Sequence, residues 1–345
     1  MNSSVREGSF VMNIGCKEQF METAWKIAIP ALTIAAAAGA AGFSGYRLME
    51  GFLRRHGTYE DDAPVDEEYI LPSIYKAYLD GLKYNNDIEA EDWTITSKDG
   101  LKLIASYIPA EGNAVRNIVL CHGYHSTGRK DFNGILQYYH ENGANLLMIE
   151  ERAHRRSEGE YLTMGIRESE DIALWSREMV RKLGDELPLY LHGVSMGAAS
   201  VLMAEGEDLP ENLVGIIADS GFTDPFDIAK DVMMRNMGVV TYVALPVVNF
   251  WAKKKTGYSM DDKSATKILR TAKHPVLFIH GTGDDLVPVH MTIKNYHACA
   301  APKRICLVDG ATHAMCWYYD TAKYKRALES FFADFERREP WEKTE

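Results

Sequence analysis

Residues 189–204 read LYLHGVSMGAASVLMA and hold the pattern Gly-x-Ser-x-Gly between Gly193 and Gly197. The first four residues form an apolar, strand-like run, and the small residues after Gly197 are typical of the start of a buried helix. A serine at such a sharp turn needs glycine on both sides, because the strained backbone leaves no room for neighbouring Cβ atoms. The pattern therefore predicts that Ser195 is a nucleophile at a helix N-terminus, where backbone amides stabilise an oxyanion.

Around this turn, short β-branched runs alternate with amphipathic stretches beyond Asp92. This alternation predicts an α/β fold with a mostly parallel, eight-stranded sheet and helices on both faces. A hairpin is expected first, because WTITS and LKLIASY flank a KDG turn. Buried strands are then expected at 117–121, 145–149, 189–192, 214–218, 276–280 and 304–308. Helices are expected at 132–141, 169–183, 196–205, 291–299 and 322–337.

The segment HGYHSTG follows the strand expected at 117–121 and brings the backbone of Tyr124 to the same sheet edge as Ser195. We predict that the amides of Tyr124 and Met196 form an oxyanion hole, where each donor contributes about 3 to 4 kcal/mol to transition-state stabilisation. His122 is an alternative catalytic base. A histidine at this position is better suited to brace the loop by hydrogen bonding, and His125 is assigned no role.

Two further loops supply an acid and a base. HGTGDDLVP follows the strand expected at 276–280, and GATHAMC follows the strand expected at 304–308. We predict Asp284 as the acid and His313 as the base, which gives the order Ser, Asp, His along the chain. Asp284 is preferred to Asp285 because of its spacing to the following Val and Pro, and Asp219 is the second choice of acid.

Residues 222–270 form an insertion that is too long and too apolar for a plain crossover. We expect a helical cap over the site, with an apolar acyl pocket formed by its large side chains. The residues assigned to this pocket are Met233, Met237, Tyr242, Phe250 and Trp251. The alternative is that these side chains only pack the cap helices together.

By composition the chain divides into an N-terminal segment (1–53), a linker with a short helix (54–91), the catalytic core (92–338) and a polar tail (339–345). Residues 27–46 form an uncharged stretch of 20 residues. A helix of this length can cross a bilayer. We expect a single membrane-associated helix there. Signal cleavage followed by secretion and a cytoplasmic location are the alternatives, and the flanking charges do not define an orientation.

The whole composition excludes several kinds of partner. The net charge of −11 gives no electrostatic footprint for nucleic acid. The five cysteines form no CxxC pair, and no HExxH motif is present, so neither a metal site nor a cofactor is expected. The expected partner is a small-molecule ester, and the sequence leaves the oligomeric state open.

The chain resembles bacterial α/β hydrolases of the esterase and serine aminopeptidase-like type, over roughly residues 91–337. The resemblance rests on HGYHSTG, ERAHRRSEGEYLTMG, GVSMGAAS, ADSGFTDP, HGTGDDLVP and GATHAM. It implies the α/β-hydrolase fold, a Ser195, Asp284 and His313 triad, and oxyanion donors at Tyr124 and Met196. Relatives often have Asp at the position of Glu150 and Gly at that of Arg155, so the loop between them is expected to differ in shape.

These residues predict a serine hydrolase that cleaves carboxylic esters through an acyl-enzyme intermediate. A peptidase or amidase, or an acyltransferase, would use the same triad. Residues 1–91 are too few for a propeller domain, which favours ester cleavage over a propeller-type oligopeptidase. A non-catalytic, membrane-tethered binding protein is a further alternative, although it would be expected to lack a triad member.

Overall fold

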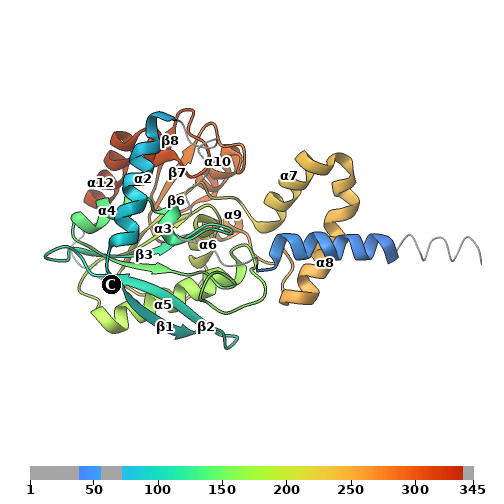
Figure 1. Ribbon diagram of the computed structural model, residues 1–345, viewed down its shortest axis with the longest axis horizontal. Coiled ribbons are helices and arrows are strands. Elements are labelled where there is room, and N and C mark those ends of the chain that lie inside the picture. The colour runs from blue at the N-terminus through green and yellow to red at the C-terminus, as the bar shows by residue number, and fades with distance from the viewer. Residues whose placement is uncertain (1–38, 56–71, 337–345) are drawn as a thin grey trace, which may run out of the picture.

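The computed structural model describes residues 39–55 and 72–336, and its centre is a twisted sheet (Figure 1). Eight strands in this part of the chain follow the order β1-β2-β4-β3-β5-β6-β7-β8. Only β2 runs against the others, because it pairs antiparallel with both β1 and β4. The expected mostly parallel, eight-stranded sheet is confirmed. The strands are β1 (Glu91–Thr96), β2 (Lys102–Ile108), β3 (Arg116–Cys121), β4 (Ala144–Ile149), β5 (Leu189–Val194), β6 (Leu213–Asp219), β7 (Val276–Gly281) and β8 (Lys303–Val308).

Helices cover both faces of the sheet and bury a hydrophobic cluster on each. One cluster includes side chains of α5, α6 and α10, and the other includes side chains of α4, α11 and α12. Because helices cover both faces of the sheet, every residue of β4, β5 and β7 is buried, and these strands have no solvent-facing side. The helices of this body are α2 (Pro72–Asp87), α3 (Gly128–Asp131), α4 (Ile135–Glu141), α5 (Ile166–Leu183), α6 (Met196–Ala204), α10 (Val289–Ala298), α11 (Cys316–Tyr319) and α12 (Thr321–Phe335).

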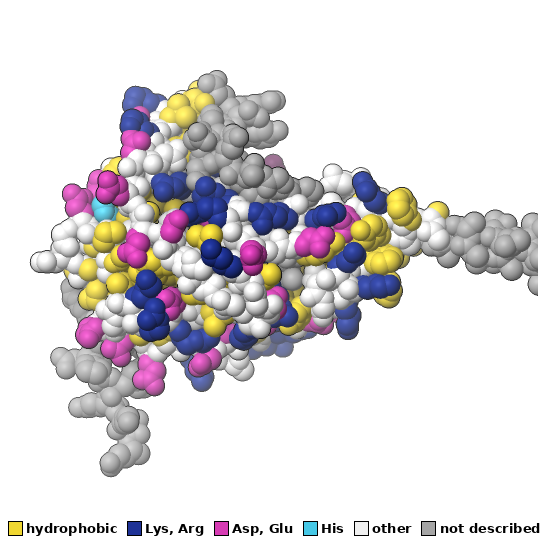
Figure 2. All heavy atoms as spheres, turned by 60° about the horizontal axis from the view of Figure 1, so that its bottom comes forward, with side chains coloured by type: hydrophobic (Ala, Val, Ile, Leu, Met, Phe, Trp, Pro, Cys, Tyr) yellow, Lys and Arg dark blue, Asp and Glu magenta, His cyan; other side chains and the backbone are white. Residues whose placement is uncertain are grey.

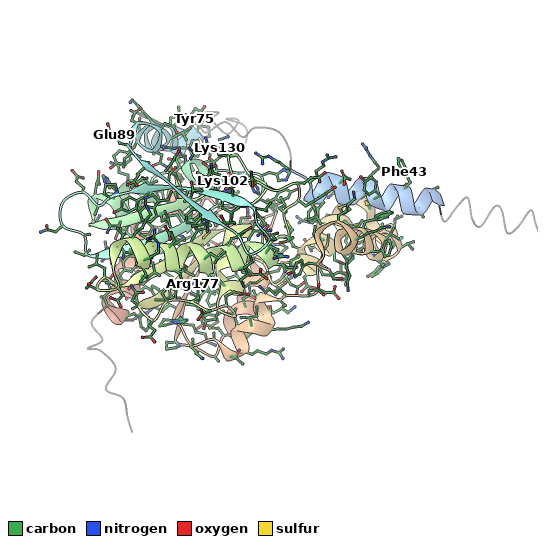
Figure 3. The ribbon with its side chains drawn as sticks, turned by 90° about the horizontal axis from the view of Figure 1, so that it is seen from below. Phe43, Tyr75, Glu89, Lys102, Lys130 and Arg177 are labelled. Carbon is green, nitrogen blue, oxygen red and sulfur yellow. The ribbon has the colours of Figure 1, made fainter. Side chains whose placement is uncertain are left out.

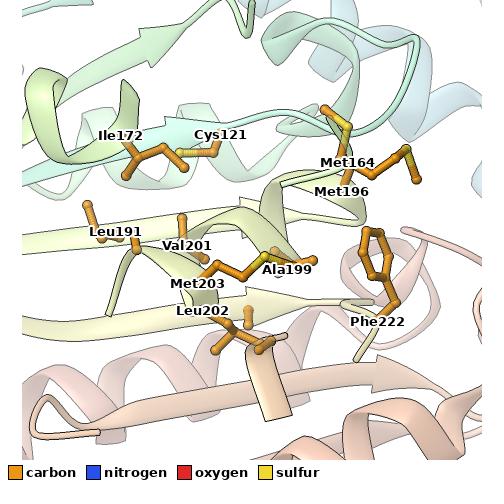
Figure 4. Close-up of a cluster of buried hydrophobic side chains, with 14 of the residues drawn as sticks. Cys121, Met164, Ile172, Leu191, Met196, Ala199, Val201, Leu202, Met203 and Phe222 are labelled. Atoms are coloured by element: carbon orange, nitrogen blue, oxygen red, sulfur yellow. The ribbon is translucent and has the colours of Figure 1, made fainter. Parts of the chain in front are cut away.

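Helix α6, which begins directly after Ser195, is the most enclosed of these helices, and all nine of its residues are buried. Its side chains pack between Leu191 of β5 and Phe222, the first residue of the insertion (Figure 4). Small residues such as Ala198 and Ala199 allow this close approach to the sheet. The start of α6, and with it Ser195, is therefore held by the densest part of the core.

The helix expected at 132–141 begins later than the sequence pattern indicated. Helix α3 ends at Asp131, and α4 begins at Ile135 after Gly134, whose φ is 75°. A residue with positive φ interrupts the regular helical hydrogen bonds, so the expected helix loses its first three residues and α3 is a separate turn of helix before it. The other expected helices of the body are present, with ends that shift by at most a few residues.

The insertion predicted at 222–270 is helical and projects from one end of the body (Figure 1). It contains α7 (Pro225–Met237), η2 (Gly238–Val240), α8 (Thr241–Thr256), α9 (Ala265–Ile268) and η3 (Leu269–Thr271). Asp224 accepts a hydrogen bond from the Asp227 amide and caps α7, and Pro225 occupies its first turn. We call α7, η2 and α8 the cap.

A helix over residues 39–53 lies along the cap. The Trp251 indole of α8 donates a hydrogen bond of 3.0 Å to the Gly42 carbonyl, and the Trp251 ring lies edge-on to Tyr46 with centroids 5.2 Å apart. Gly45 faces Val247 so closely that a Cβ at this position would overlap the valine side chain. The N-terminal helix is therefore an integral part of the cap packing.

The sequence predicts a membrane-crossing helix at 27–46, and residues 27–38 of this stretch lie outside the described residues. Positions 56–71 of the linker and the polar tail also lie outside them. Among the helices that the structure describes, none combines the length and the apolar character that crossing a bilayer requires.

The buried His192 of β5 makes the stability of this fold depend on pH. Its Nδ1 lies 2.9 Å from the Tyr139 hydroxyl and its Nε2 lies 3.3 Å from the Tyr324 hydroxyl. Burial lowers the pKa of His192 to about 3. Because the unfolded chain takes up a proton near pH 6.5 and the folded chain does not, acid favours unfolding through this group.

We expect the free energy of unfolding of the wild-type protein, relative to that of His192→Gln, to fall by about 2 kcal/mol between pH 7 and pH 5. Glutamine can form hydrogen bonds but does not titrate. Subtracting the unfolding free energy of His192→Gln from that of the wild-type protein therefore removes the pH dependence of all other groups. Urea denaturation at both pH values measures it. A difference that does not change with pH would contradict a depressed pKa at His192.

Candidate active site

Ser195 lies at the turn between β5 and α6 with φ 56° and ψ −116°. Its amide continues the parallel ladder by donating a hydrogen bond of 2.8 Å to the Asp219 carbonyl. A Cβ on Gly193 would overlap the Gly197 carbonyl, and a Cβ on Gly197 would overlap the Cys121 carbonyl at the end of β3. Both glycines of the motif are therefore required by backbone contacts, as the sequence pattern predicted.

The structure brings Ser195 together with both residues predicted to act with it. The His313 Nε2 lies 2.8 Å from the Ser195 Oγ, and the His313 Nδ1 lies 2.7 Å from the Asp284 Oδ2. Asp284 comes from the loop after β7 and His313 from the loop after β8, so the loops after β5, β7 and β8 meet at the C-terminal edge of the sheet. The two distances form one continuous hydrogen-bonded chain of carboxylate, imidazole and hydroxyl.

Two glycines allow the Asp284 and His313 loops to approach each other. A Cβ on Gly281, the last residue of β7, would overlap the Ala311 carbonyl, and a Cβ on Gly283 would lie 2.7 Å from the Gly310 carbonyl. The Gly283 amide donates a hydrogen bond of 3.1 Å to the Ala311 carbonyl. The glycines that border Asp284 in the sequence are therefore contact points between the two loops.

The Asp284 carboxylate is enclosed and held by several donors. Its Oδ1 accepts hydrogen bonds from the amides of Leu286 and Val287 at 2.9 and 2.8 Å, and its Oδ2 lies 3.2 Å from the His280 Nε2. Burial alone would raise the pKa of Asp284, but the hydrogen bonds of His280, His313 and Val287 hold that pKa well below its usual range. The carboxylate is thus ionised and fixed beside the imidazole.

The two alternative acids occupy other positions. Asp285 is exposed, and its carbonyl accepts a hydrogen bond from the Arg235 side chain of α7. Asp219 is buried at the end of β6, where it accepts hydrogen bonds of 2.9 Å from both Ser220 and Tyr324. These partners tie Asp219 to the turn after β6.

The loop predicted to supply an oxyanion donor lies directly beside the nucleophile. A Cβ on Gly123 would lie 3.0 Å from the Ser195 Cβ. The Gly123 amide donates a hydrogen bond of 2.5 Å to the Asp131 Oδ2, and the Ser126 hydroxyl donates one of 2.6 Å to the Asp131 Oδ1. Asp131 thereby fixes the loop that carries Tyr124, while Met196 follows Ser195 as the first residue of α6.

Two buried histidines, His122 and His154, hold the loop of Gly123 and Tyr124 by hydrogen bonds to its backbone. The His122 Nε2 accepts a hydrogen bond of 3.1 Å from the Glu151 amide, so its Nδ1 carries the proton and donates to the Gly123 carbonyl at 2.8 Å. The His154 Nε2 accepts from the His125 amide at 3.1 Å. Burial lowers the pKa of His122 to about 4 and that of His154 to about 3. His122 is thus a neutral bracing residue in this geometry, with both ring nitrogens occupied.

The loop from Glu150 to Arg156 has a backbone conformation suited to glycine at one position. Arg155 has φ 42°, in the left-handed region. Glu150 accepts hydrogen bonds of 2.8 Å from both the amide and the Nε of Arg156. The backbone at Arg155 therefore has the shape that a glycine would favour, and the longer Glu150 side chain pairs with Arg156.

A cavity of about 650 Å³ adjoins His313, with walls that include residues of α2, α3 and the loop of Asp285 and Leu286. Its walls combine apolar side chains with charged ones, including Lys130, Asp131 and Asp285. The predicted acyl pocket was assigned to the cap instead. The structure places Tyr242 and Phe250 on the solvent side of α8, because its other side buries Leu245, Val248 and Ala252.

The structure does not bring Tyr242, Phe250 and Trp251 together around a pocket, since Tyr242 and Phe250 are exposed and Trp251 packs against the N-terminal helix. Met237 is not among the residues that line the cavity beside His313 or the cavity beside Met233. Met233 does line one. A cavity of about 270 Å³ lies between the cap and the N-terminal helix, with walls formed by Arg47, Leu48, Gly51, Phe52, Ala229, Val232, Met233 and Val248.

Phe52 connects the apolar cavity to the loop of Gly123 and Tyr124, which we call the oxyanion loop because it is predicted to supply an oxyanion donor. The Tyr124 hydroxyl donates a hydrogen bond of 2.9 Å to the Phe52 carbonyl, and the two rings lie 5.8 Å apart. Neither Phe52 nor Asp131 is predicted from the sequence. Phe52 contacts Tyr124 across 72 residues of chain, which no local pattern can show. Asp131 lies only eight residues from Gly123, but no recognised motif marks a carboxylate at this spacing.

The backbone at Ser195 stores strain, since a side chain is unfavourable at φ 56°. We expect the free energy of unfolding of Ser195→Gly to exceed that of Ser195→Ala by about 1 kcal/mol. Alanine is the matched reference, because it removes the same hydroxyl but keeps the Cβ. Urea denaturation of both variants measures the difference, and an S195G protein that is the less stable of the two would show that the turn carries no strain.

No model of a known protein family matches the chain. It is similar to the uncharacterized protein YqkD of Bacillus subtilis, with 27% identity over 66% of this chain and 74% of the relative. It is also similar to the uncharacterized protein YfhR of Escherichia coli K12, with 26% identity over 71% of this chain and 82% of the relative.

Solved structures resemble the chain in fold. An esterase of Pyrococcus furiosus, Pf2001, superposes with a TM-score of 0.58 at 19% identity, over 81% of this chain and 99% of its own. The acylaminoacyl peptidase of Pyrococcus horikoshii superposes with a TM-score of 0.54 at 16% identity, over 76% of this chain and 45% of its own. The sheet order, the helices on both faces and these neighbours show that the chain has the α/β-hydrolase fold.

Proposed function

We propose that this protein is a serine hydrolase that cleaves carboxylic esters through an acyl-enzyme intermediate. The observation that carries the proposal is the chain of hydrogen bonds from Asp284 through His313 to Ser195, with distances of 2.7 and 2.8 Å. Asp284 is ionised and accepts at the His313 Nδ1, so this nitrogen carries the proton and Nε2 can accept the proton of the serine.

In the proposed reaction, the Ser195 Oγ attacks the ester carbonyl carbon while His313 takes up the hydroxyl proton. The negative charge that develops on the carbonyl oxygen is stabilised by the amides of Met196 and Tyr124, with the N-terminus of α6 adding favourable potential. His313 then donates its proton to the leaving alcohol. A water molecule, deprotonated by His313, then attacks the acyl carbon. The bond from that carbon to the Ser195 Oγ breaks, the acid is released, and His313 returns the proton to the Ser195 Oγ.

Cleavage of esters is preferred to cleavage of peptides on two grounds. The similarity to the Pyrococcus furiosus esterase covers 99% of that protein, whereas the similarity to the acylaminoacyl peptidase covers 45% of that protein. In addition, the cavity beside Phe52 is lined mainly by apolar side chains, which suits an acyl chain. We propose that the acyl group lies there, because Phe52 and Tyr124 connect this cavity to the oxyanion loop.

The triad assignment predicts large losses of turnover. We expect Ser195→Ala to lower kcat for p-nitrophenyl esters by about 10⁶-fold and Asp284→Asn to lower it by about 10⁴-fold. Asp285→Asn is the matched control for the acid and should keep most of the activity, because its carboxylate is exposed. Nearly unchanged turnover in Ser195→Ala would end the assignment of Ser195 as the nucleophile.

The same assay distinguishes the alternative reactions. Wild-type protein is tested on p-nitrophenyl esters of increasing chain length, on aminoacyl anilides, and on an ester with an added alcohol as acceptor. We expect kcat/KM to be higher for esters, with water as the acyl acceptor. Preference for the anilides would indicate a peptidase, and transfer to the added alcohol would indicate an acyltransferase.

The proposed acyl site makes a separate prediction about chain length. Met233→Trp adds volume in the cavity beside Phe52, so kcat/KM should fall for long acyl chains and remain near the wild-type value for acetate esters. Met237→Trp is the matched control, because Met237 lies on the same helix outside the cavity. An equal loss for short and long chains in Met233→Trp would place the acyl group elsewhere.

A further inference from the structure

Exposed hydrophobic side chains gather at the end of the molecule formed by the cap and the N-terminal helix. Seven of the eleven large hydrophobic side chains exposed in the described part of the chain lie there. Five of them, which we call the cap surface, are each between 54% and 76% exposed. The cap surface consists of Val239, Val240, Tyr242, Val243 and Phe250.

The cap surface is not a side effect of internal packing. Helix α8 already buries its inward side through Leu245, Val248 and Ala252. The turn between α7 and α8 also lies away from the sheet, at the outer edge of the projecting cap (Figure 1). A concentration of apolar area of this kind on one end of a protein marks a contact with an apolar partner.

The charge around the cap surface is opposite in sign to that of the whole chain. Residues 225–256 contain five basic side chains and two acidic ones, whereas the net charge of the chain is −11. Lys253, Lys254 and Lys255 are exposed at the end of α8, and the Lys230 Nζ lies 5.9 Å from the centre of the Tyr242 ring. Figure 2 shows hydrophobic and basic side chains together at this end of the molecule. The combination fits an anionic lipid surface.

The direction of the chain points to the same partner. The N-terminal helix leaves the body at this end, and Phe43, which is 65% exposed, lies near its outer end (Figures 1 and 3). The sequence that directly precedes it, residues 27–38, contains no charged residue. The described chain therefore begins at the same end of the molecule as the cap surface, directly after an uncharged stretch of sequence.

We propose that the cap surface rests on the surface of an anionic lipid bilayer, with the turn between α7 and α8 inserted among the headgroups. This docking brings the apolar cavity between the N-terminal helix and the cap next to the lipid. It does not depend on the proposed ester hydrolysis, because it rests on exposure and charge outside the triad.

The test uses the full chain with one environment-sensitive fluorophore attached at a single cysteine. Cys16 is changed to Ser, and the four remaining cysteines are buried free thiols. The fluorophore is attached in Val243→Cys and, as the matched control, in Val115→Cys, which is 47% exposed in the loop before β3. Both proteins are mixed with phosphatidylcholine vesicles, with or without phosphatidylserine, that carry a nitroxide quencher near the headgroup.

We expect the emission at position 243 to shift to the blue and to be quenched by the nitroxide, more strongly with phosphatidylserine, while position 115 shows neither effect. Replacing Lys253, Lys254 and Lys255 by Glu should weaken the effect of phosphatidylserine. Protein that fails to bind the vesicles would overturn the proposal. Protein that binds without quenching at position 243 would also overturn it, since the cap surface would then face another partner, such as a second copy of the chain.

Discussion

The fold and the site depend on backbone contacts that leave no space for a Cβ atom. Gly197 lies against the Cys121 carbonyl, and Gly193 lies against Gly197, so the strands β3 and β5 and the helix α6 meet at one point. A similar contact between Gly281 and Ala311 joins the loops after β7 and β8. These contacts fix three separate loops at one edge of the sheet, and the hydrogen bonds among Ser195, Asp284 and His313 follow from that arrangement.

Around this centre, buried polar groups hold the loops in place without taking part in the proposed proton transfer. Asp131 fixes the loop of Gly123 and Tyr124, and the neutral side chains of His122 and His154 connect that loop to the segment after β4. The N-terminal helix joins the same network through Phe52 and Tyr124. The cap, the apolar cavity and the oxyanion loop are therefore mechanically connected, so the position of the N-terminal helix bears directly on the geometry beside Ser195.

The strands and the three residues of the triad could be predicted from sequence because their signals are local. Strands buried on both faces appear as short apolar runs, and Ser195, Asp284 and His313 each follow such a run within three residues of a glycine. The acyl pocket could not be predicted in the same way. Helix α8 is apolar on both sides, so its sequence does not show that Tyr242 faces solvent, and the observed cavity needs the N-terminal helix, about 180 residues away along the chain, to form its second wall.

The most direct test of the central claim is mass spectrometry of the protein after reaction with a fluorophosphonate, which modifies only an activated serine. The account predicts one adduct per chain, located by peptide mapping on Ser195, and no adduct in His313→Ala, because the imidazole is needed to activate the hydroxyl. An adduct on a different residue, or an unmodified Ser195 in protein that hydrolyses esters, would contradict it.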